Sequence, residues 1–83
     1  MVKTVDKTDE FVRIVKKIKD NSTRDRIEKQ IVRIIQNPEI GKPMRYIRKG
    51  TREVHVSPYR LSYAYIKEED KIIFLDLYHK DEQ

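Results

Sequence analysis

The stretch Thr51–His79, TREVHVSPYRLSYAYIKEEDKIIFLDLYH, decides the fold of this 83-residue chain. Its pattern predicts three strands, over residues 51–57, 60–66 and 72–78, because β-branched and aromatic residues recur there between turn-forming segments. Only a turn at Pro58 and the charged run Lys67–Lys71 separate these strands. Connections this short join antiparallel neighbours, so the stretch predicts a three-stranded antiparallel meander.

Alternation within the meander assigns its side chains to two faces of the predicted sheet. His55 alternates with valines and is interpreted as an ordinary exposed strand position. We expect Tyr63 and Tyr65 to pack in the core. The residues that share a face are Arg52, Val54 and Val56 in the first strand, Glu53, His55 and Ser57 opposite them, and Leu61, Tyr63 and Tyr65 in the second strand.

A first amphipathic helix is predicted to begin after Thr8, which is a suitable N-cap. Asp9 and Glu10 then fall in the first turn, where the helix dipole favours negative charge. The basic residues Lys16, Lys17 and Lys19 most simply form a solvated face, and contact with ribosomal RNA is the alternative. The apolar residues recur at helical spacing and are Phe11, Ile14, Val15 and Ile18.

A second helix is predicted to start at Ser22, because Ser22 and Asp25 match the S-x-x-D capping pattern. It ends at Asn37, since the residue before Pro38 is disfavoured in the α region. The short connection between the helices predicts an antiparallel hairpin. The apolar stripe of this helix consists of Ile27, Ile31, Ile34 and Ile35.

Together these elements predict an α+β fold with two layers and a single domain over residues 1–83. The expected order is a short N-terminal strand at Met1–Val5, the helical hairpin and the meander. A further short strand is possible at Met44–Arg48, in the stretch punctuated by Gly41, Pro43 and Gly50.

The composition limits the classes of function. A net charge of +5 suggests a polyanionic partner, either nucleic acid or an acidic protein. The absence of Cys excludes disulfides and thiolate chemistry, and no ligand spacing for a metal or glycine-rich phosphate loop occurs, so no cofactor is expected. With neither an apolar run of membrane length nor a signal-peptide pattern at the start, we expect a cytoplasmic protein without membrane contact.

The remaining chemical signal is a cluster of cations in and around the meander. Arg52, Arg60 and Lys80 are expected to converge on one concave face, which would suit a phosphodiester. The members of the cluster are Arg45, Arg48, Lys49 and Arg52 near the Gly50 turn, Arg60 at the start of the next strand, and His79 and Lys80 after the last one.

This arrangement resembles the RelE/ParE toxin superfamily, and its RelE-like branch in particular. The segment REVHVSPYRLSYAY, with its Tyr-Arg-x-x-Tyr motif at Tyr59–Tyr63, is similar to the RelE core. The segment IIFLDLYHK at Ile72–Lys80 is similar to the final strand that delivers a basic or histidine residue to the active site. With the preceding helical hairpin, the resemblance covers nearly the whole chain.

The resemblance implies the toxin of a type II toxin–antitoxin system, a metal-independent and ribosome-dependent endoribonuclease in which the 2′-hydroxyl of the mRNA attacks the adjacent phosphate. In that role Arg60 would stabilise the transition state, with Arg52 as a second cation. His79 would act as general acid or base, and Lys80 would supply charge or share the acid role. The residues expected to bind RNA are Arg45, Arg48, Lys49 and Tyr78.

The implied partners are the ribosome, mRNA and a RelB-like antitoxin that would form a hetero-oligomer with this chain. Many members continue into a C-terminal helix with a base-stacking aromatic, whereas this sequence ends at Gln83, so Tyr78 is the candidate for stacking. Two alternatives are a ParE-like toxin that inhibits DNA gyrase without nuclease activity, and an RNA-binding module without catalysis. The ending Tyr78-His79-Lys80 argues against the gyrase inhibitor.

Overall fold

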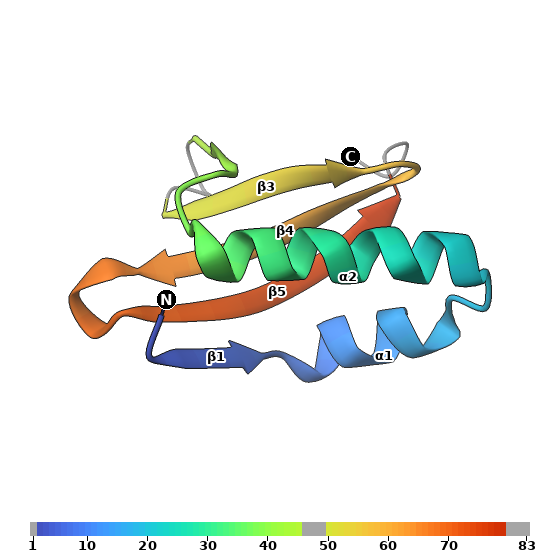
Figure 1. Cartoon of the computed structure of the whole chain (residues 1–83), viewed down its shortest axis with the longest axis horizontal. Coiled ribbons are helices and arrows are strands. Elements are labelled where there is room, and N and C mark those ends of the chain that lie inside the picture. Colours follow the sequence, from blue (N-terminus) through green and yellow to red (C-terminus); the bar gives the residue numbers. More distant parts are fainter. Residues whose placement is uncertain (1, 46–49, 80–83) are drawn as a thin grey trace.

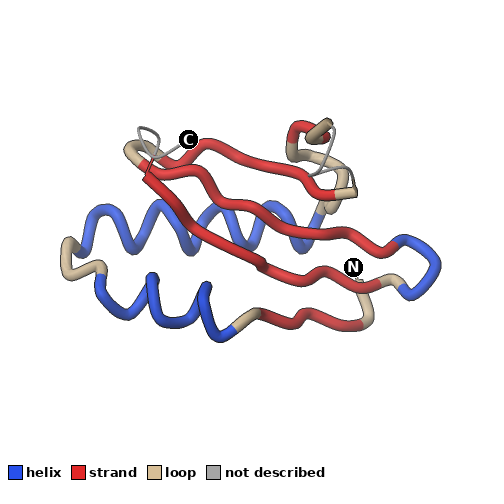
Figure 2. Tube along the Cα trace, turned by 180° about the vertical axis from the view of Figure 1, so that it is seen from behind, coloured by secondary structure: helices blue, strands red, loops and turns tan. Residues whose placement is uncertain are grey.

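The computed structural model describes residues 2–45 and 50–79, which form two helices and a five-stranded sheet. Both helices lie on one face of the sheet (Figures 1 and 2). The predicted two-layer α+β fold is therefore confirmed. Neither described helix has the length and apolar character needed to cross a bilayer.

The predicted meander forms the centre of the sheet. Its strands are β3 (Thr51–Val56), β4 (Tyr59–Ile66) and β5 (Lys71–His79), and they pair antiparallel in chain order. A short 3₁₀ helix at Lys67–Glu69 connects β4 to β5 within the predicted charged turn. The full strand order is β1-β5-β4-β3-β2, so the two short strands lie at the edges.

The two edge strands differ from their predicted positions. β1 is Thr4–Lys7 rather than Met1–Val5, because its register is fixed by parallel pairing with β5 from Lys71 to Phe74. β2 is only Lys42–Pro43, paired with β3, rather than Met44–Arg48. Proline lacks an N–H donor and is tolerated at such an edge. Residues 46–48 of the predicted strand lie outside the described residues.

The core lies between the sheet and the two helices, α1 (Asp9–Lys17) and α2 (Asn21–Gln36). Phe11 of α1 stacks on Phe74 of β5 with ring centroids 5.5 Å apart. Each fully buried side chain of this kind contributes roughly 1.5–3 kcal/mol. Tyr63 is completely buried as predicted, whereas Tyr65 is only half-buried at the core's edge. The buried apolar residues include Phe11, Ile18, Ile27 and Ile34 from the helical segments and Leu61, Tyr63, Ile72, Phe74 and Leu77 from the strands.

One irregularity in β5 controls which side chains reach each face of the sheet. Ser62 pairs with Asp76, but the next residue, Tyr63, pairs with Phe74, which leaves Leu75 as an extra, unpaired residue. Such a bulge reverses the alternation of the strand beyond it. Phe74 and Leu77 can therefore both face the helices, while Tyr78 joins the opposite face.

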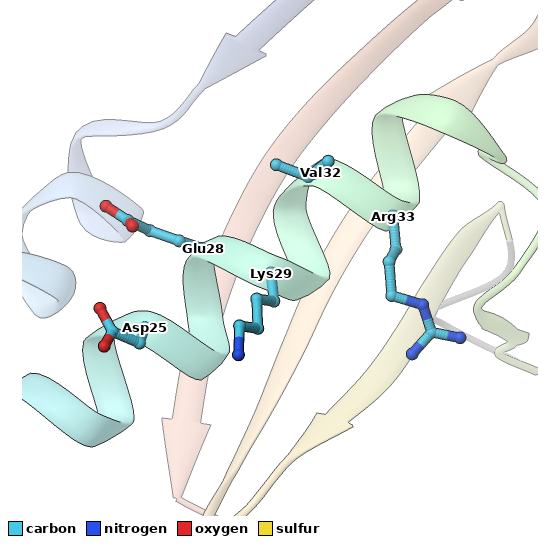
Figure 3. A pocket seen from close by; sticks show the side chains of 5 residues that line it. All are labelled: Asp25, Glu28, Lys29, Val32 and Arg33. Carbon is cyan, nitrogen blue, oxygen red and sulfur yellow. The ribbon is translucent and has the colours of Figure 1, made fainter.

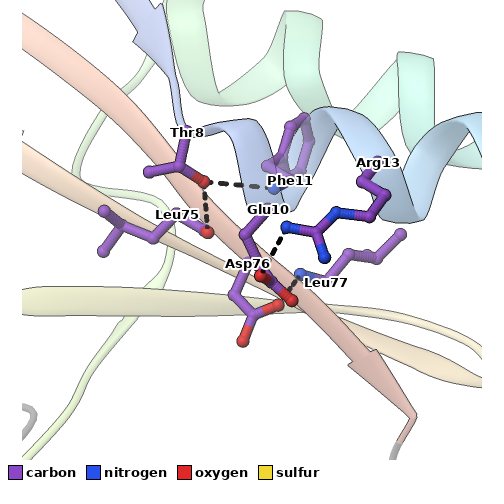
Figure 4. Close-up of polar contacts among 7 residues, drawn as sticks. All are labelled: Thr8, Glu10, Phe11, Arg13, Leu75, Asp76 and Leu77. Carbon is purple, nitrogen blue, oxygen red and sulfur yellow. Dashed lines mark hydrogen bonds and ion pairs between the residues drawn. The ribbon is translucent and has the colours of Figure 1, made fainter.

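Thr8 fixes this bulge to the first helix (Figure 4). Its hydroxyl donates a hydrogen bond to the Leu75 carbonyl at 2.7 Å and accepts one from the Phe11 N–H at 3.1 Å. The backbone N–H of Thr8 also donates to the Phe74 carbonyl at 3.0 Å. The predicted N-cap is confirmed, and the same side chain satisfies the carbonyl of the bulged residue.

The second helix begins earlier than predicted, because Asp20 rather than Ser22 is its N-cap. The Asp20 carboxylate accepts hydrogen bonds from the N–H of Thr23 at 3.1 Å and from its hydroxyl at 2.5 Å. Asp20 stands three residues before Thr23, so its oxygen reaches the free N–H of the first turn, whereas Ser22 is already inside the helix. The predicted end is confirmed, since Asn37 is the C-cap.

Replacing Thr8 by Val removes both side-chain hydrogen bonds while keeping the shape of the side chain. We expect the free energy of unfolding to fall by about 1–2 kcal/mol, the cost of a lost cap and an unsatisfied carbonyl. Urea unfolding followed by circular dichroism measures this difference. Thr4→Val in the exposed strand β1 is the control and should change stability by less than about 0.5 kcal/mol. Equal stabilities for the two variants would show that Thr8 does not anchor the bulge.

A second prediction concerns the acid stability of the α2 cap. The hydrogen bond from the Thr23 hydroxyl lowers the pKa of Asp20, so the folded state holds the charged carboxylate more tightly than the unfolded state does. This contribution is present above the ordinary pKa of aspartate and is lost as the pH falls through the lowered value.

We therefore expect wild type to be more stable than Asp20→Asn at neutral pH, and the difference to disappear in acid. Urea titrations between neutral and acid pH measure it, with Ser22→Ala as the control that should follow wild type. A Ser22→Ala variant that lost more stability than Asp20→Asn would show that Ser22 is the N-cap, as predicted from the sequence.

Candidate active site

The bulge places a row of three polar side chains across the face of the sheet opposite the helices, here called the open face. Arg60 in β4 lies directly opposite His55 in β3 and directly opposite Tyr78 in β5. Directly opposed side chains in antiparallel strands have Cβ atoms about 5 Å apart. The row His55–Arg60–Tyr78 therefore brings an imidazole, a guanidinium and a phenol within reach of one small ligand.

A groove of about 620 Å³ opens beside this row, between β3 and the segment that includes β2. Its walls carry three cations, Lys42, Arg45 and Arg60, together with His55 and a single carboxylate, Glu53. The concentration of positive charge suits an anionic ligand, and arginine can contact a phosphate with two donors at once. The lining residues are Lys42, Pro43, Met44, Arg45, Glu53, Val54, His55 and Arg60.

Glu53 is the buried carboxylate of the open face. Its side chain is only 4% exposed and lies 3.8 Å, Oε1 to NH1, from the Arg60 guanidinium. The Tyr78 hydroxyl donates a hydrogen bond to the other carboxylate oxygen, Oε2. A buried carboxylate is costly unless it is paired and hydrogen-bonded, and these contacts come from β4 and β5. Glu53 therefore links β3 to β4 and β5 beneath the groove.

The geometry leaves Arg60 able to bind a ligand. A separation of 3.8 Å attracts Arg60 to Glu53 but is too long for a hydrogen bond. The Arg60 Nε is buried and has no hydrogen-bond partner within residues 2–45 and 50–79. Glu53 thus holds the charge of Arg60 at the groove without occupying the donor atoms that would grip an oxyanion.

The open face contains part of the site that was expected from the sequence. Arg45 and Arg60 line the same groove, and Tyr78 lies opposite Arg60 on the same face. Arg48, Lys49 and Lys80 lie outside the described residues, so their predicted contributions stay predictions.

Arg52 does not join this site, and the predicted convergence of Arg52 with Arg60 is wrong. Arg52 lies opposite the buried Tyr63, on the face that the helices cover. Its guanidinium donates hydrogen bonds to the backbone carbonyls of Glu39 at 3.0 Å and Gly41 at 2.8 Å. Adjacent residues of a strand point to opposite faces, so a cation next to Glu53 cannot share its face.

The Arg52 contacts form part of a second anchor around Gly41. The Gly41 N–H donates to the Tyr63 hydroxyl at 2.9 Å, and that hydroxyl donates to the Pro38 carbonyl at 2.7 Å. Burial raises the pKa of the Tyr63 phenol. A Cβ atom at Gly41 would lie 2.6 Å from the Tyr63 hydroxyl oxygen, so the chain passes too close for any larger residue.

His79 is also on the wrong side for the role predicted for it. It lies opposite Tyr59, and the two rings meet edge to face with centroids 5.7 Å apart. The expectation failed because the Leu75 bulge shifts the alternation of β5 by one residue, which places Tyr78 on the face of Arg60 and His79 on the opposite face.

Glu53 was not predicted from the sequence to belong to the site, and His55 was predicted only as an ordinary exposed strand position. His55 is exposed as expected, but it also lines the groove and a second hollow of about 260 Å³ between α2 and β3. The alternation of the strand could have indicated them, because Glu53 and His55 are two residues apart and therefore share a face. Both lie near Arg60 once the strands pair.

Another hollow, of about 500 Å³, lies on α2 and does not resemble a site. Figure 3 shows that its side chains come from one helix and point apart, with Asp25 and Glu28 directed away from Arg33. In the described part of the chain no three His, Cys, Asp or Glu side chains are grouped in a way that could hold a metal ion.

The family model of the ParE toxin of the type II toxin–antitoxin system parDE matches residues 5–83. No curated protein sequence matches the chain significantly.

Solved structures give strong matches to the fold. The isolated RelE toxin of E. coli has a TM-score of 0.78 at 19% identity, covering 92% of this chain and 82% of that one. The RelBE2 toxin–antitoxin complex of Mycobacterium tuberculosis gives 0.73 at 26% identity, covering 96% and 100%. The archaeal RelE–RelB complex of Pyrococcus horikoshii gives 0.77 at 15% identity, covering all of both chains.

The placement of Arg52 predicts a structural role for that residue. Arg52→Met keeps the apolar stem but removes both hydrogen bonds to the Glu39–Gly41 segment, so the free energy of unfolding should fall by about 1–2 kcal/mol. Arg13→Met is the matched control, because the Arg13–Glu10 pair is exposed and such pairs contribute little. Chemical denaturation of both variants measures the difference, and an Arg52→Met protein as stable as wild type would contradict this role.

Proposed function

We propose that this chain, which belongs to the ParE toxin family of type II toxin–antitoxin systems, is a ribosome-dependent endoribonuclease that cleaves messenger RNA. The observation that carries the proposal is the placement of Arg60 in a cationic groove, with its guanidinium 3.8 Å from Glu53 and its Nε without a hydrogen-bond partner among residues 2–45 and 50–79.

The proposed reaction uses the 2′-hydroxyl of the RNA itself as the nucleophile. Its attack on the adjacent phosphate adds negative charge to the phosphoryl oxygens in the transition state. Arg60 stabilises that charge, and preorganised donors aimed at a developing oxyanion are typically a large part of catalysis. Lys42 and Arg45 attract the neighbouring phosphates as point charges along the groove wall. DNA lacks the 2′-hydroxyl and is spared.

The ribosome positions the RNA strand, which the small groove cannot do alone. The groove is formed by a few side chains at one edge of the sheet, and it contacts a phosphate and its immediate neighbours. Positioning the rest of the strand in line for attack requires an external template, and correct positioning is worth several kcal/mol of a reaction barrier. Translating ribosomes hold the mRNA in a defined path, so free RNA is a poor substrate.

The second candidate function is inhibition of DNA gyrase without nuclease activity. The family model favours it, because the match is to a ParE toxin, whereas the structural relatives named above are RelE proteins. A gyrase inhibitor has no need of a phosphate-binding arginine beside acid–base side chains, and this feature favours the ribonuclease.

The proposed physiological partner is an antitoxin. The structural relatives include RelBE2 and RelE–RelB complexes. This chain carries a net charge of +5, so an antitoxin segment rich in Asp and Glu would gain from charge complementarity and from folding on binding. We propose that the two proteins form a hetero-oligomer in the cytoplasm, where the ribosomes are, and that binding covers the groove.

The test compares wild type with Arg60 variants on translating ribosomes carrying a defined mRNA, with 5′ ends mapped by primer extension. Wild type should create new ends within the codon at the ribosomal A site. Arg60→Ala should reduce this cleavage by at least about tenfold, roughly 1.4 kcal/mol of transition-state stabilisation. Arg60→Lys retains the charge beside Glu53 but lacks the planar fork, and should also be impaired. The exposed Arg13→Ala is the matched control and should cleave normally.

A wild-type protein that leaves ribosome-bound mRNA intact would overturn the ribonuclease. A DNA-supercoiling assay with purified gyrase then decides between the remaining functions. Inhibition of supercoiling would identify the gyrase toxin, and RNA binding without either effect would identify a binding module.

A further inference from the structure

We propose that Glu53 and His55 form the acid–base pair of the cleavage reaction, with Glu53 as the general base and His55 as the general acid on either side of the phosphate held by Arg60. This inference rests on the proposed ribonuclease function. It transfers to His55 the acid–base role that the sequence suggested for His79.

The backbone places the two groups at a useful separation. Glu53 and His55 are two residues apart on β3 and point to the same face, so their Cα atoms are about 7 Å apart. Arg60 lies directly opposite His55, and its guanidinium reaches diagonally to Glu53. A phosphate gripped by Arg60 therefore lies between the carboxylate and the imidazole. In-line displacement needs this arrangement, because the attacking and leaving oxygens are on opposite sides of the phosphorus.

The lining of the groove leaves few other candidates for proton transfer. Arginine stays protonated in proteins, and Lys42 lies across the groove from the row His55–Arg60–Tyr78. Pro43, Met44 and Val54 have no group that can exchange a proton. Among the described lining residues, Glu53 and His55 carry an acid–base group and also lie beside Arg60.

Glu53 has the features of an oriented base. An ionised carboxylate only accepts hydrogen bonds, and the hydroxyl of Tyr78 fixes one of its oxygens while the other faces Arg60. In the proposed step, Arg60 moves onto the phosphate and this second oxygen accepts the proton of the attacking hydroxyl. Tyr78 acts here as a positioning residue for the carboxylate.

His55 has the features of the acid. It is exposed at the rim of the groove, where the leaving half of the RNA departs into solvent. The charged groups that surround it are Arg60 in the row, Lys42 and Arg45 across the groove, Arg26, Lys29 and Arg33 across the second hollow, and Glu53 on its own strand. The bound phosphodiester adds negative charge among these cations, and in the proposed step its leaving 5′-oxygen departs past the imidazole.

The step balances in atoms and charge. The proton of the 2′-hydroxyl passes to the Glu53 carboxylate as the 2′-oxygen bonds to phosphorus. The bond between phosphorus and the 5′-oxygen breaks, and the proton of the His55 imidazolium passes to that oxygen. The products are an RNA end with a 2′,3′-cyclic phosphate and an RNA end with a 5′-hydroxyl.

The test uses ribosome-bound mRNA in which the bridging 5′-oxygen at the A-site linkage is replaced by sulfur. A thiolate leaves without protonation, so this substrate makes the general acid unnecessary. On the normal linkage, His55→Gln and Glu53→Gln should each slow cleavage by about 100-fold or more, the usual contribution of a proton-transfer group. On the sulfur linkage, His55→Gln should recover most of its rate, whereas Glu53→Gln should remain slow.

Matched variants separate catalysis from folding. Glu53→Asp keeps a proton-accepting carboxylate and should retain more activity than Glu53→Gln, which keeps the shape and the acceptor for Tyr78. Affinity for ribosomes carrying an uncleavable 2′-deoxy linkage should be unchanged in Glu53→Gln and His55→Gln. His79→Gln, on the other face of β5, and the exposed Glu10→Gln should cleave like wild type.

The outcomes distinguish the two levels of the proposal. Wild type that cleaves neither substrate overturns the ribonuclease, and the acid–base pair with it. Active wild type with fully active Glu53→Gln or His55→Gln overturns only the pair. Recovery of Glu53→Gln rather than His55→Gln on the sulfur linkage overturns the assignment of base and acid.

Discussion

The hydrogen bond from the Thr8 hydroxyl to the carbonyl of Leu75 holds the irregularity on which the open face depends. Without an extra residue at Leu75, Tyr78 would share a face with Phe74 and point toward the helices, Leu77 would lie opposite Arg60, and His79 would lie on the open face. A bulge leaves backbone groups outside the ladder, and Thr8 satisfies one of them while capping α1. The start of the first helix and the composition of the site are therefore fixed by one side chain.

The open face is organised around a buried carboxyl group rather than around its cations. Glu53 loses its hydration in the fold, and its contacts there include the hydroxyl of Tyr78 and the charge of Arg60. Such a group is weak evidence for stability, because an apolar residue in its place is often no worse. Its presence beneath a basic groove is better explained by function, which includes orienting Arg60.

In the proposed function, the basic surface and the site serve different partners of the same toxin. The groove is suited to one phosphate and its neighbours, whereas the charge of the whole chain suits an acidic antitoxin segment. The family match confirms the resemblance seen in the motif Tyr59–Tyr63. A toxin that acts on RNA and is bound by an acidic antitoxin would use both the groove and the basic charge. An antitoxin that covers the groove and its cations would inhibit the toxin by exclusion, without any change in the fold.

The sequence by itself determined the layers, the meander, the helical stripes and the family, because these follow from local periodicity, turn-forming residues and a motif contained in one strand. It also identified Arg60. Only the tertiary structure decided which residues accompany Arg60, since that depends on pairing between strands. Arg52 lies on the helix side because alternation separates it from Glu53, and Tyr78 rather than His79 lies on the open face because of the bulge at Leu75. No local pattern encodes a bulge whose carbonyl is satisfied by a threonine sixty-seven residues earlier in the chain.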